Sequence, residues 1–159
     1  MDIAHYLRQF AYDTWANEAA IGSIEQLKAK DTEPARKLMS HIFVSQKVWL
    51  MRLIGEEIPS DINIFPAYSL DECRKLTEEF HDFWREYLGN LTKGEIAYPI
   101  RYTTTTGVEF VNSVQDIVTH VLTHSAYHRA QIATHVRECG KSPAVTDFIA
   151  YAREFPVKK

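Results

Sequence analysis

Cysteine is scarce in this 159-residue sequence, and no hydrophobic run is long enough to cross a bilayer. The two cysteines, Cys73 and Cys139, lie far apart and form no C-x-x-C pair, so we expect two free thiols in a reducing compartment. The amino terminus does not carry a basic stretch followed by an apolar one, as a signal peptide would. These absences predict a cytoplasmic protein that has no membrane partner.

The sequence also lacks a block of basic residues, and its formal net charge is −3. A nucleic-acid partner is therefore not expected, because binding to phosphate backbones depends on clustered lysine and arginine. Three common catalytic motifs are missing as well, namely H-E-x-x-H, G-x-S-x-G and a phosphate-binding loop. What remains is an ordinary globular composition in a chain whose length suits one domain over residues 1–159.

Apolar residues recur with a helical period in four long segments, at about residues 3–28, 34–54, 69–89 and 113–139. The ends of these segments carry recognisable start and stop signals. Ser69 and Glu72 form a predicted capping box at the start of the third helix. Gly55 and Gly140 follow the last turns of the second and fourth helices, where glycine commonly ends a helix. The sequence therefore predicts four helices with defined boundaries.

The connectors between these helices differ in character. Residues 55–69 have no helical period, and at roughly 3.3 Å per residue they can span the length of the preceding helix. The second and third helices are then parallel, which predicts an all-α, up-down-down-up four-helix bundle. Residues 96–111 alternate with a period of two around Gly107, which predicts a small β-hairpin between the third and fourth helices. A short C-terminal helix, capped by Thr146 or Asp147, is expected to follow.

Three of the seven histidines, His120, His124 and His128, fall in the fourth predicted helix at a spacing of four. Side chains four residues apart stack on one face of a helix. On a helical wheel, His128 falls near the middle of the apolar stripe and His120 at its edge. His124 and His135 lie beside the stripe, whereas Arg129 falls mostly outside it. At least two histidines are therefore expected to face the interior.

A single histidine on an apolar face is often a hydrogen-bonded core residue rather than a metal ligand. Two of them one turn apart favour a shared metal ion, because burying several unpaired polar rings is costly. His41 lies on or near the inward face of the second helix and can supply a third ligand. We predict a divalent metal site made by His41, His124 and His128, with His120 and His135 in reserve. Imidazole ligands suit zinc or nickel, and they also bind iron and copper.

Two other polar residues, His81 and Asn17, lie in predicted helices but are not predicted metal ligands. His81 belongs to an E-x-x-H pair, but a carboxylate-bridged di-iron bundle needs a second such pair, which is absent. We therefore expect His81 to lie at the surface or at its boundary. Asn17, in the middle of the first helix, either reaches a partner across the core or is solvated.

The sequence resembles the DinB-like (damage-inducible) family in three places. They are YHRAQI at residues 127–132 preceded by His124, WAN at residues 15–17 and TDFI at residues 146–149. The resemblance covers essentially the whole chain and implies an up-down-down-up bundle, a homodimer and a three-histidine site that commonly holds zinc or nickel. His41 falls where the second helix of that family supplies its ligand. Ala130 departs from the pattern, because glycine is frequent there, and is expected to alter packing rather than ligation.

Two classes of function follow from these features. The first is a metal-dependent enzyme for a small-molecule substrate, either a thiol S-transferase or a hydrolase, in which a metal-bound water or thiol performs the chemistry. The family's larger set resembles transferases that depend on bacillithiol or mycothiol, so a low-molecular-weight thiol is a candidate cofactor. The second is a non-catalytic, metal-binding stress-response protein that acts through a partner. A homodimer is also favoured by the many aromatic residues, which exceed what one bundle interior needs.

Overall fold

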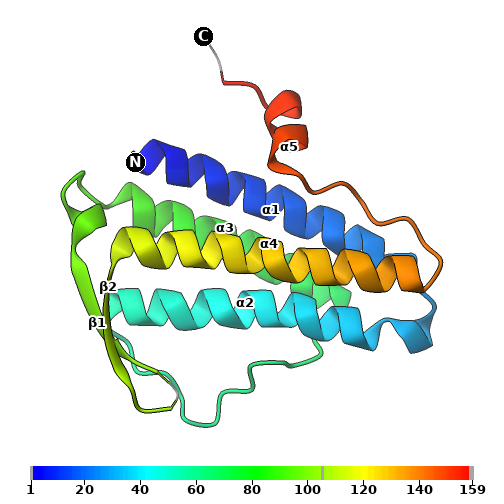
Figure 1. Cartoon of the computed structure of the whole chain (residues 1–159), viewed down its shortest axis with the longest axis horizontal. Coiled ribbons are helices and arrows are strands. Elements are labelled where there is room, and N and C mark those ends of the chain that lie inside the picture. Colours follow the sequence, from blue (N-terminus) through cyan, green and yellow to red (C-terminus); the bar gives the residue numbers. More distant parts are fainter. Residues whose placement is uncertain (1, 105, 158–159) are drawn as a thin grey trace.

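Four long helices run side by side along the longest axis of the molecule (Figure 1). The structure is a computed structural model that describes residues 2–104 and 106–157. The long helices are α1 (Ile3–Glu25), α2 (Glu33–Ile54), α3 (Leu70–Gly89) and α4 (Val114–Glu138). Helices α1 and α4 run in one direction and α2 and α3 in the other, so the up-down-down-up prediction is confirmed. The first helix ends three residues earlier than predicted, and a 3₁₀ turn (Ala29–Asp31) follows.

The helix boundaries follow the local sequence signals. The Ser69 side chain accepts a hydrogen bond from the Glu72 amide, and the Glu72 carboxylate accepts one from the Ser69 amide, so the predicted capping box is present. Ser113 and Asp116 form the same arrangement at the start of α4. Gly55 ends α2 with φ at 76°, a left-handed conformation that costs glycine little and other residues more.

The connector at residues 55–69 runs back along the bundle to the end where α2 began (Figure 1). We call this segment the crossover. Arg36 holds its far end by donating hydrogen bonds to the carbonyls of Ala67 and Tyr68 at 2.7 and 2.9 Å. Ser40 accepts another from the Tyr68 amide at 3.1 Å. Ile64 of the crossover is exposed, whereas Tyr68 packs against the core, so polar contacts to α2 and one apolar side chain together attach the crossover.

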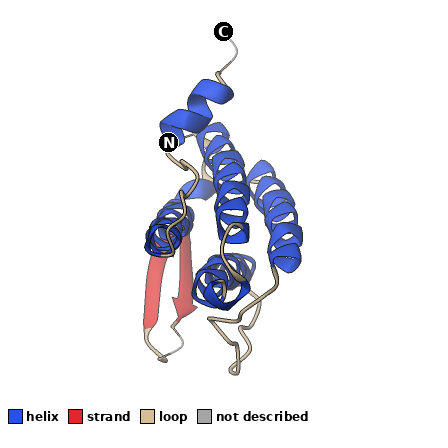
Figure 2. Cartoon of the chain, turned by 90° about the vertical axis from the view of Figure 1, so that its right-hand side faces the viewer, coloured by secondary structure: helices blue, strands red, loops and turns tan. Residues whose placement is uncertain are grey.

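The predicted hairpin consists of β1 (Pro99–Thr103) and β2 (Glu109–Ser113), paired antiparallel from Pro99 opposite Ser113 to Thr103 opposite Glu109. A second 3₁₀ turn (Glu95–Ala97) precedes it, and Thr105 in its tip lies outside the described residues. The hairpin sits at the end of the bundle where α4 begins, and Figure 2 shows the helices nearly end-on. The ring of Tyr102 meets that of Trp49 on α2 edge to face at 5.1 Å.

The core lies between the four long helices. Helix α1 packs against α3 and α4, and α2 packs against the same two helices from the other side. Fully buried large side chains come from each of the four long helices: Tyr6, Ile21, Ile24, Met39, Ile42, Phe43, Trp84, Leu88, Ile117, Val118 and Ile132. The short helix α5 (Phe148–Glu154) covers α1 through Tyr12 and Tyr151, whose rings are 5.8 Å apart. Among the described residues, no helix combines the length and apolar character that crossing a bilayer requires.

Candidate metal centre

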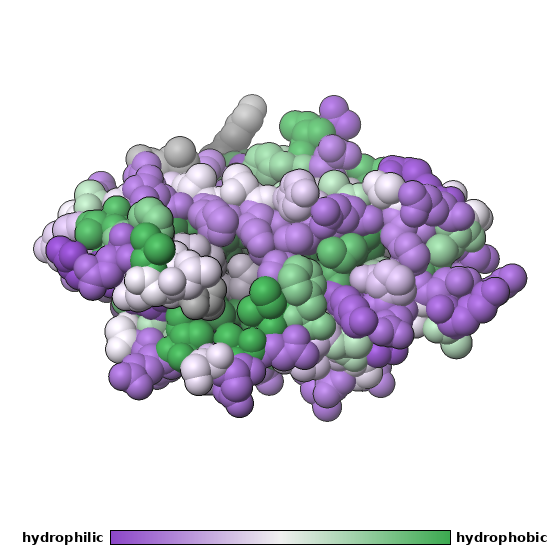
Figure 3. Space-filling model, turned by 60° about the horizontal axis from the view of Figure 1, so that its bottom comes forward, coloured by the Kyte–Doolittle hydropathy of each residue, from purple (hydrophilic) through white to green (hydrophobic). Residues whose placement is uncertain are grey.

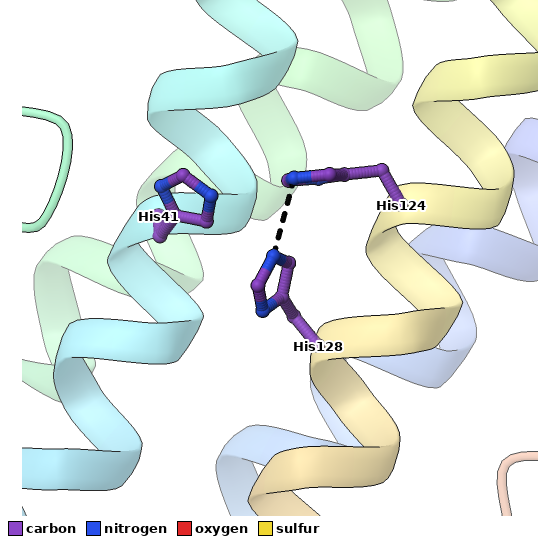
Figure 4. A group of neighbouring side chains, drawn as sticks. All are labelled: His41, His124 and His128. Carbon is purple, nitrogen blue, oxygen red and sulfur yellow. Dashed lines mark hydrogen bonds between the residues drawn. The ribbon is translucent and has the colours of Figure 1, made fainter.

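Three imidazoles converge between α2 and α4 (Figure 4). His41 comes from α2, and His124 and His128 come from successive turns of α4. One ring nitrogen from each lies within 4.8 Å of the other two. The Nε2 atoms of His124 and His128 are 3.1 Å apart. The structure therefore brings together the three side chains that the sequence singled out, although His41 and His124 are 83 residues apart in the chain.

The positions of these rings follow from helix geometry. His124 and His128 are four residues apart, so their rings stack along α4 with centroids 4.4 Å apart. Helix α2 packs against α4 and places the His41 ring 5.0 Å from His124 and 4.7 Å from His128. His128 is buried, whereas His41 and His124 are half-buried. The site consequently lies at the edge of the core rather than at its centre.

Two of the imidazoles are held by acceptors on the side away from the site. The Nδ1–H of His41 donates to the carbonyl of Ile64 at 2.6 Å, and Phe65 stacks on the same ring at 4.0 Å. The Nδ1–H of His128 donates to Oε1 of Gln131 at 2.7 Å. These bonds fix the tautomer in which Nε2 carries a lone pair. His41 and His128 are therefore oriented as metal ligands are, with a partner behind each ring.

His124 differs from the other two histidines. Because His128 Nε2 carries a lone pair, the 3.1 Å contact requires His124 to donate from its own Nε2. Ligation by His124 Nε2 would require that proton to move to Nδ1 or to leave. The pKa of His124 is lowered to about 4, mainly by burial and to a smaller extent by the neighbouring His128, His41 and His120. The pKa of His128 is also lowered, mainly by burial. Both rings are thus neutral near pH 7, as metal ligation requires.

The cluster fits a small divalent ion after a modest adjustment. Around a tetrahedral zinc with bonds of about 2.1 Å, ligand nitrogens lie about 3.4 Å apart. The separation between the Nε2 atoms of His124 and His128 is close to this value, and the largest separation in the cluster, at most 4.8 Å, is somewhat longer. The potential ligand group found in residues 2–104 and 106–157 contains these three histidines and no carboxylate. Three protein ligands would leave one or more positions for water or another molecule.

The two reserve histidines lie outside this group. The ring of His120 is 5.5 Å from that of His124, but it packs against Trp49 and is exposed. His135 bonds the carbonyl of Asp31 at 2.8 Å and so ties α4 to the 3₁₀ turn after α1. His81, expected near the surface, is half-buried and bonds the hydroxyl of Thr14 at 3.0 Å. None of these three side chains extends the metal cluster.

A buried polar network next to the site was missed by the sequence analysis. Arg129 was expected mostly outside the apolar stripe, but it is 2% exposed and forms an ion pair with Asp13 of α1. Arg129 also donates to Asn17 at 2.8 Å, so Asn17 reaches across the core rather than into solvent. Gln46 of α2 donates to Asp13 at 2.9 Å and accepts from Trp84 at 2.9 Å. The network joins all four long helices.

The one positive and the one negative charge of this network, on Arg129 and Asp13, balance each other. Burial lowers the pKa of Arg129, but the Asp13 carboxylate more than offsets it, and the net shift is upward. Asn17 donates to Asp13 at 3.1 Å, and Ser125 accepts a longer bond from Gln46 at 3.4 Å. Asp13 and Asn17 are four residues apart beside the core residue Phe10, a spacing that could have signalled an inward polar pair. Arg129 pairs with a residue 116 positions away, which no local pattern indicates.

Comparison with known proteins agrees with this geometry. A curated relative is "Protein DinB" of Bacillus subtilis (strain 168), which is 21% identical over 155 residues. That match covers 89% of this chain and 90% of the relative. The model of the DinB family matches residues 4–155, a span that contains all of the four long helices except the first residue of α1, together with the hairpin and the three converging histidines. On the extent of this match, the chain belongs to the DinB family.

Proposed function

We propose that this protein is a metal-dependent enzyme that uses the three-histidine cluster to bind a divalent ion and act on a small molecule. The convergence of His41, His124 and His128 carries the proposal, because each can offer a ring nitrogen to one point. Hydrogen bonds from His41 to Ile64 and from His128 to Gln131 support it, since protein metal ligands commonly have such partners. Zinc or nickel suits an all-imidazole set.

The open side of the cluster distinguishes catalysis from metal storage or a purely structural role. Structural zinc sites are usually closed by four protein ligands, whereas catalytic sites keep a position free. A divalent ion held by these histidines would lower the pKa of a bound water or thiol and polarise a carbonyl. The protein's own contribution would be to hold the ligands, to keep His124 and His128 neutral, and to place the substrate beside them.

Thiol transfer is the version that we favour over hydrolysis. Neither cysteine of the chain lies in the ligand group. Cys73 is buried in α3, and burial raises the pKa of its thiol to about 11, so it resists ionisation. Cys139 lies at the end of α4, 3.7 Å from His135 rather than beside the cluster. A thiolate nucleophile would therefore come from a separate small molecule such as bacillithiol, mycothiol or glutathione.

The test compares thiols and metals on one protein. Metal-free protein is loaded with zinc or nickel, its stoichiometry is measured, and each thiol is assayed against a model electrophile. His124→Ala serves as the site variant and His5→Ala, on the exposed start of α1, as the matched control. We expect one ion per chain and a thiol-dependent rate that the His124 variant loses.

Each other result of this assay would support a different alternative. Ester or amide cleavage without any thiol, lost in His124→Ala, would favour the hydrolase. Stoichiometric metal binding with no turnover of any substrate would favour the non-catalytic stress-response protein that acts through a partner. Failure to bind zinc, nickel, copper or iron at the cluster would overturn the proposal altogether.

We also propose that the chain forms a two-fold homodimer through the surface of its long helices. Tyr127 of α4 is 63% exposed, and a large side chain of this kind gains from being covered. Sedimentation equilibrium at micromolar protein should give twice the mass of the chain. The monomer mass alone would contradict this assembly.

A further inference from the structure

A cleft of about 720 Å³ opens between the crossover and the hairpin. Small-molecule sites commonly enclose roughly 300–1,000 Å³, so its size suits a compact ligand. One wall is apolar and is formed by crossover residues that include Ile58, Ile62 and Ile64. The opposite wall is formed by the end of α2 and by strand β1. Figure 3, turned so that the underside of the view in Figure 1 comes forward, shows hydrophobic residues (green) gathered among hydrophilic ones (purple).

The cleft contains a cation, Arg52, to which residues 2–104 and 106–157 supply no counter-ion. The Arg52 guanidinium lies 4.4 Å from the Trp49 ring centroid and 4.9 Å from that of Tyr102. Within the described part of the chain it makes one weak hydrogen bond, from Nη2 to the Thr103 carbonyl at 3.4 Å, and no ion pair. Its Nε is buried without an acceptor. Burial lowers the pKa of Arg52, and the nearby Tyr102 phenol opposes this.

This arrangement is unusual for a half-buried charge. Removing a guanidinium from water costs free energy unless an anion or several acceptors replace the lost hydration. The Tyr102 hydroxyl is bonded to Asn112 at 2.9 Å, so the aromatic ring that faces Arg52 is itself fixed. Stacking on Trp49 holds the guanidinium plane in one orientation, which reduces the entropy that a ligand must remove on binding. Arg52 is thus positioned for an anion that the chain does not supply.

The other charges of the cleft narrow the class of anion. Arg101 pairs with Glu109 at 3.5 Å, so its charge is already balanced. Glu56 and Glu57 line the cleft but are exposed, and neither lies within ion-pair distance of Arg52. Two exposed carboxylates would repel a multiply charged phosphate more strongly than a singly charged group. A planar carboxylate also matches the guanidinium fork.

Residues that line the cleft, or that lie against Arg52, also contact histidines in or beside the metal centre. Ile64 lines the cleft, and its carbonyl holds the His41 ring. Trp49, which stacks on Arg52, also contacts His120 at 5.0 Å, and His120 contacts His124 at 5.5 Å. Arg52 follows His41 by eleven residues on α2, roughly 16 Å along the helix axis, so a ligand held at Arg52 would have to extend along the crossover past Ile64 to reach the three-histidine cluster.

We propose that this cleft is the ligand site of the protein and that Arg52 binds a carboxylate of the substrate or thiol. The role of that ligand as a substrate rests on the proposed metal-dependent function. The binding itself depends only on the cleft residues. Arg52 is then a specificity-determining residue that selects small monocarboxylates over neutral analogues of the same shape.

The test uses phenylacetate as the probe, with phenylacetamide as its neutral analogue and inorganic phosphate as a second anion. Binding to the full chain is followed by ¹H–¹⁵N NMR, at the Arg52 side-chain Nε–H and the Trp49 indole. The variants are Arg52→Gln, Arg52→Lys as the conservative change, and Arg85→Gln as the matched control, an exposed, ion-paired arginine of α3 outside the cleft. Circular dichroism and melting temperature report whether each variant folds.

We expect phenylacetate to bind more tightly than both phenylacetamide and phosphate. Arg52→Gln should weaken phenylacetate binding about tenfold or more, since a charge-assisted hydrogen bond is lost. Arg52→Lys should retain part of the affinity, and Arg85→Gln should change it less than about threefold, because this exposed ion pair lies outside the cleft. The amide should bind all variants alike.

Equal affinity for acid and amide, tighter binding of phosphate, or an Arg52→Gln variant that binds as the wild type does would overturn the carboxylate site. Lack of any shift at Arg52 up to the solubility limit of phenylacetate would do the same. Metal binding to the wild type, measured separately from phenylacetate binding, distinguishes this inference from the proposed function. If no metal binds the wild type and phenylacetate still binds in an Arg52-dependent way, the enzyme proposal fails and the carboxylate site stands.

Discussion

His128 and Arg129 are consecutive residues of α4, yet they belong to two opposite kinds of polar cluster. Arg129 faces α1 and pairs with Asp13 and Asn17, although its Nε and Nη2 are buried without an acceptor in the described part of the chain. His128 faces α2, where its Nε2 accepts from His124 Nε2 and lies beside the His41 ring (Figure 4). A network built on a buried ion pair stabilises one arrangement of helices, whereas converging ring nitrogens provide a place for a metal ion once the His124 Nε2 proton moves or leaves.

The two clusters also lie close together on the same two helices, α2 and α4. Gln46 and Ser125 belong to the network, and they follow His41 by five residues and His124 by one on the same helices. Fixing α2 against α4 through these residues fixes the distance between the histidines that they carry. Stability and ligand geometry can therefore be separated experimentally by changing one cluster at a time.

The largest effect is expected from breaking the buried network. Asp13→Ala leaves the Arg129 charge buried without its partner, which typically costs about 3–5 kcal/mol of unfolding free energy. Urea denaturation should show this loss directly. Glu109→Ala removes the exposed partner of Arg101 and should cost less than about 1 kcal/mol. Similar losses in the two variants would show that the Asp13–Arg129 pair does not fix the helices as described.

Metal binding should produce the next largest effect. Zinc or nickel at about 100 times its dissociation constant should stabilise the native state by about 2.7 kcal/mol, because only the folded chain presents the assembled site. The melting temperature should rise in the wild type and remain unchanged in His124→Ala. The metal-free wild type should keep its helical circular dichroism, since the apolar core does not depend on the site. A chelated chain without helical signal would assign the metal a structural role.

A smaller effect is expected from the partner behind His128. Gln131→Ala removes the acceptor that holds the ring, and loss of such a partner typically weakens metal affinity by about 10–100-fold. Unfolding free energy without metal should change little. Gln115→Ala, a half-buried glutamine elsewhere on α4, is the matched control for competitive chelator titrations. Equal metal affinity in the two variants would remove Gln131 from the site.

The smallest effect concerns acid stability of the metal-free protein. The pKa of His124 is lowered from 6.5 to about 4 in the folded chain. As the pH falls from 6.5 towards 4, the unfolded chain takes up a proton before the folded one does, so the free energy of unfolding decreases. Chelated wild type should lose more stability over this range than His124→Gln, which lacks the titrating ring. Parallel pH profiles for the two proteins would count against a buried neutral His124.

The sequence by itself determined the features that depend on neighbours within a few residues. Helical periods set the four long helices, and the Ser69–Glu72 and Ser113–Asp116 pairs set where α3 and α4 begin. The spacing of His124 and His128 fixed their stacking, because one helical turn is a local property. The crossover length alone predicted that α2 and α3 are parallel, since a connector of that reach can return along the bundle.

Only the tertiary structure decided which distant groups meet. A helical wheel places His41 on an inward face but does not show that the crossover supplies a carbonyl behind its ring. The same limit explains the misplacement of Arg129, because a charged residue at the edge of an apolar stripe is buried only when a partner such as Asp13 lies across the core. The cleft at Arg52 likewise exists only where the crossover and the hairpin come together. Pairing free energies of this kind depend on distances between helices, which the order of residues along one helix does not encode.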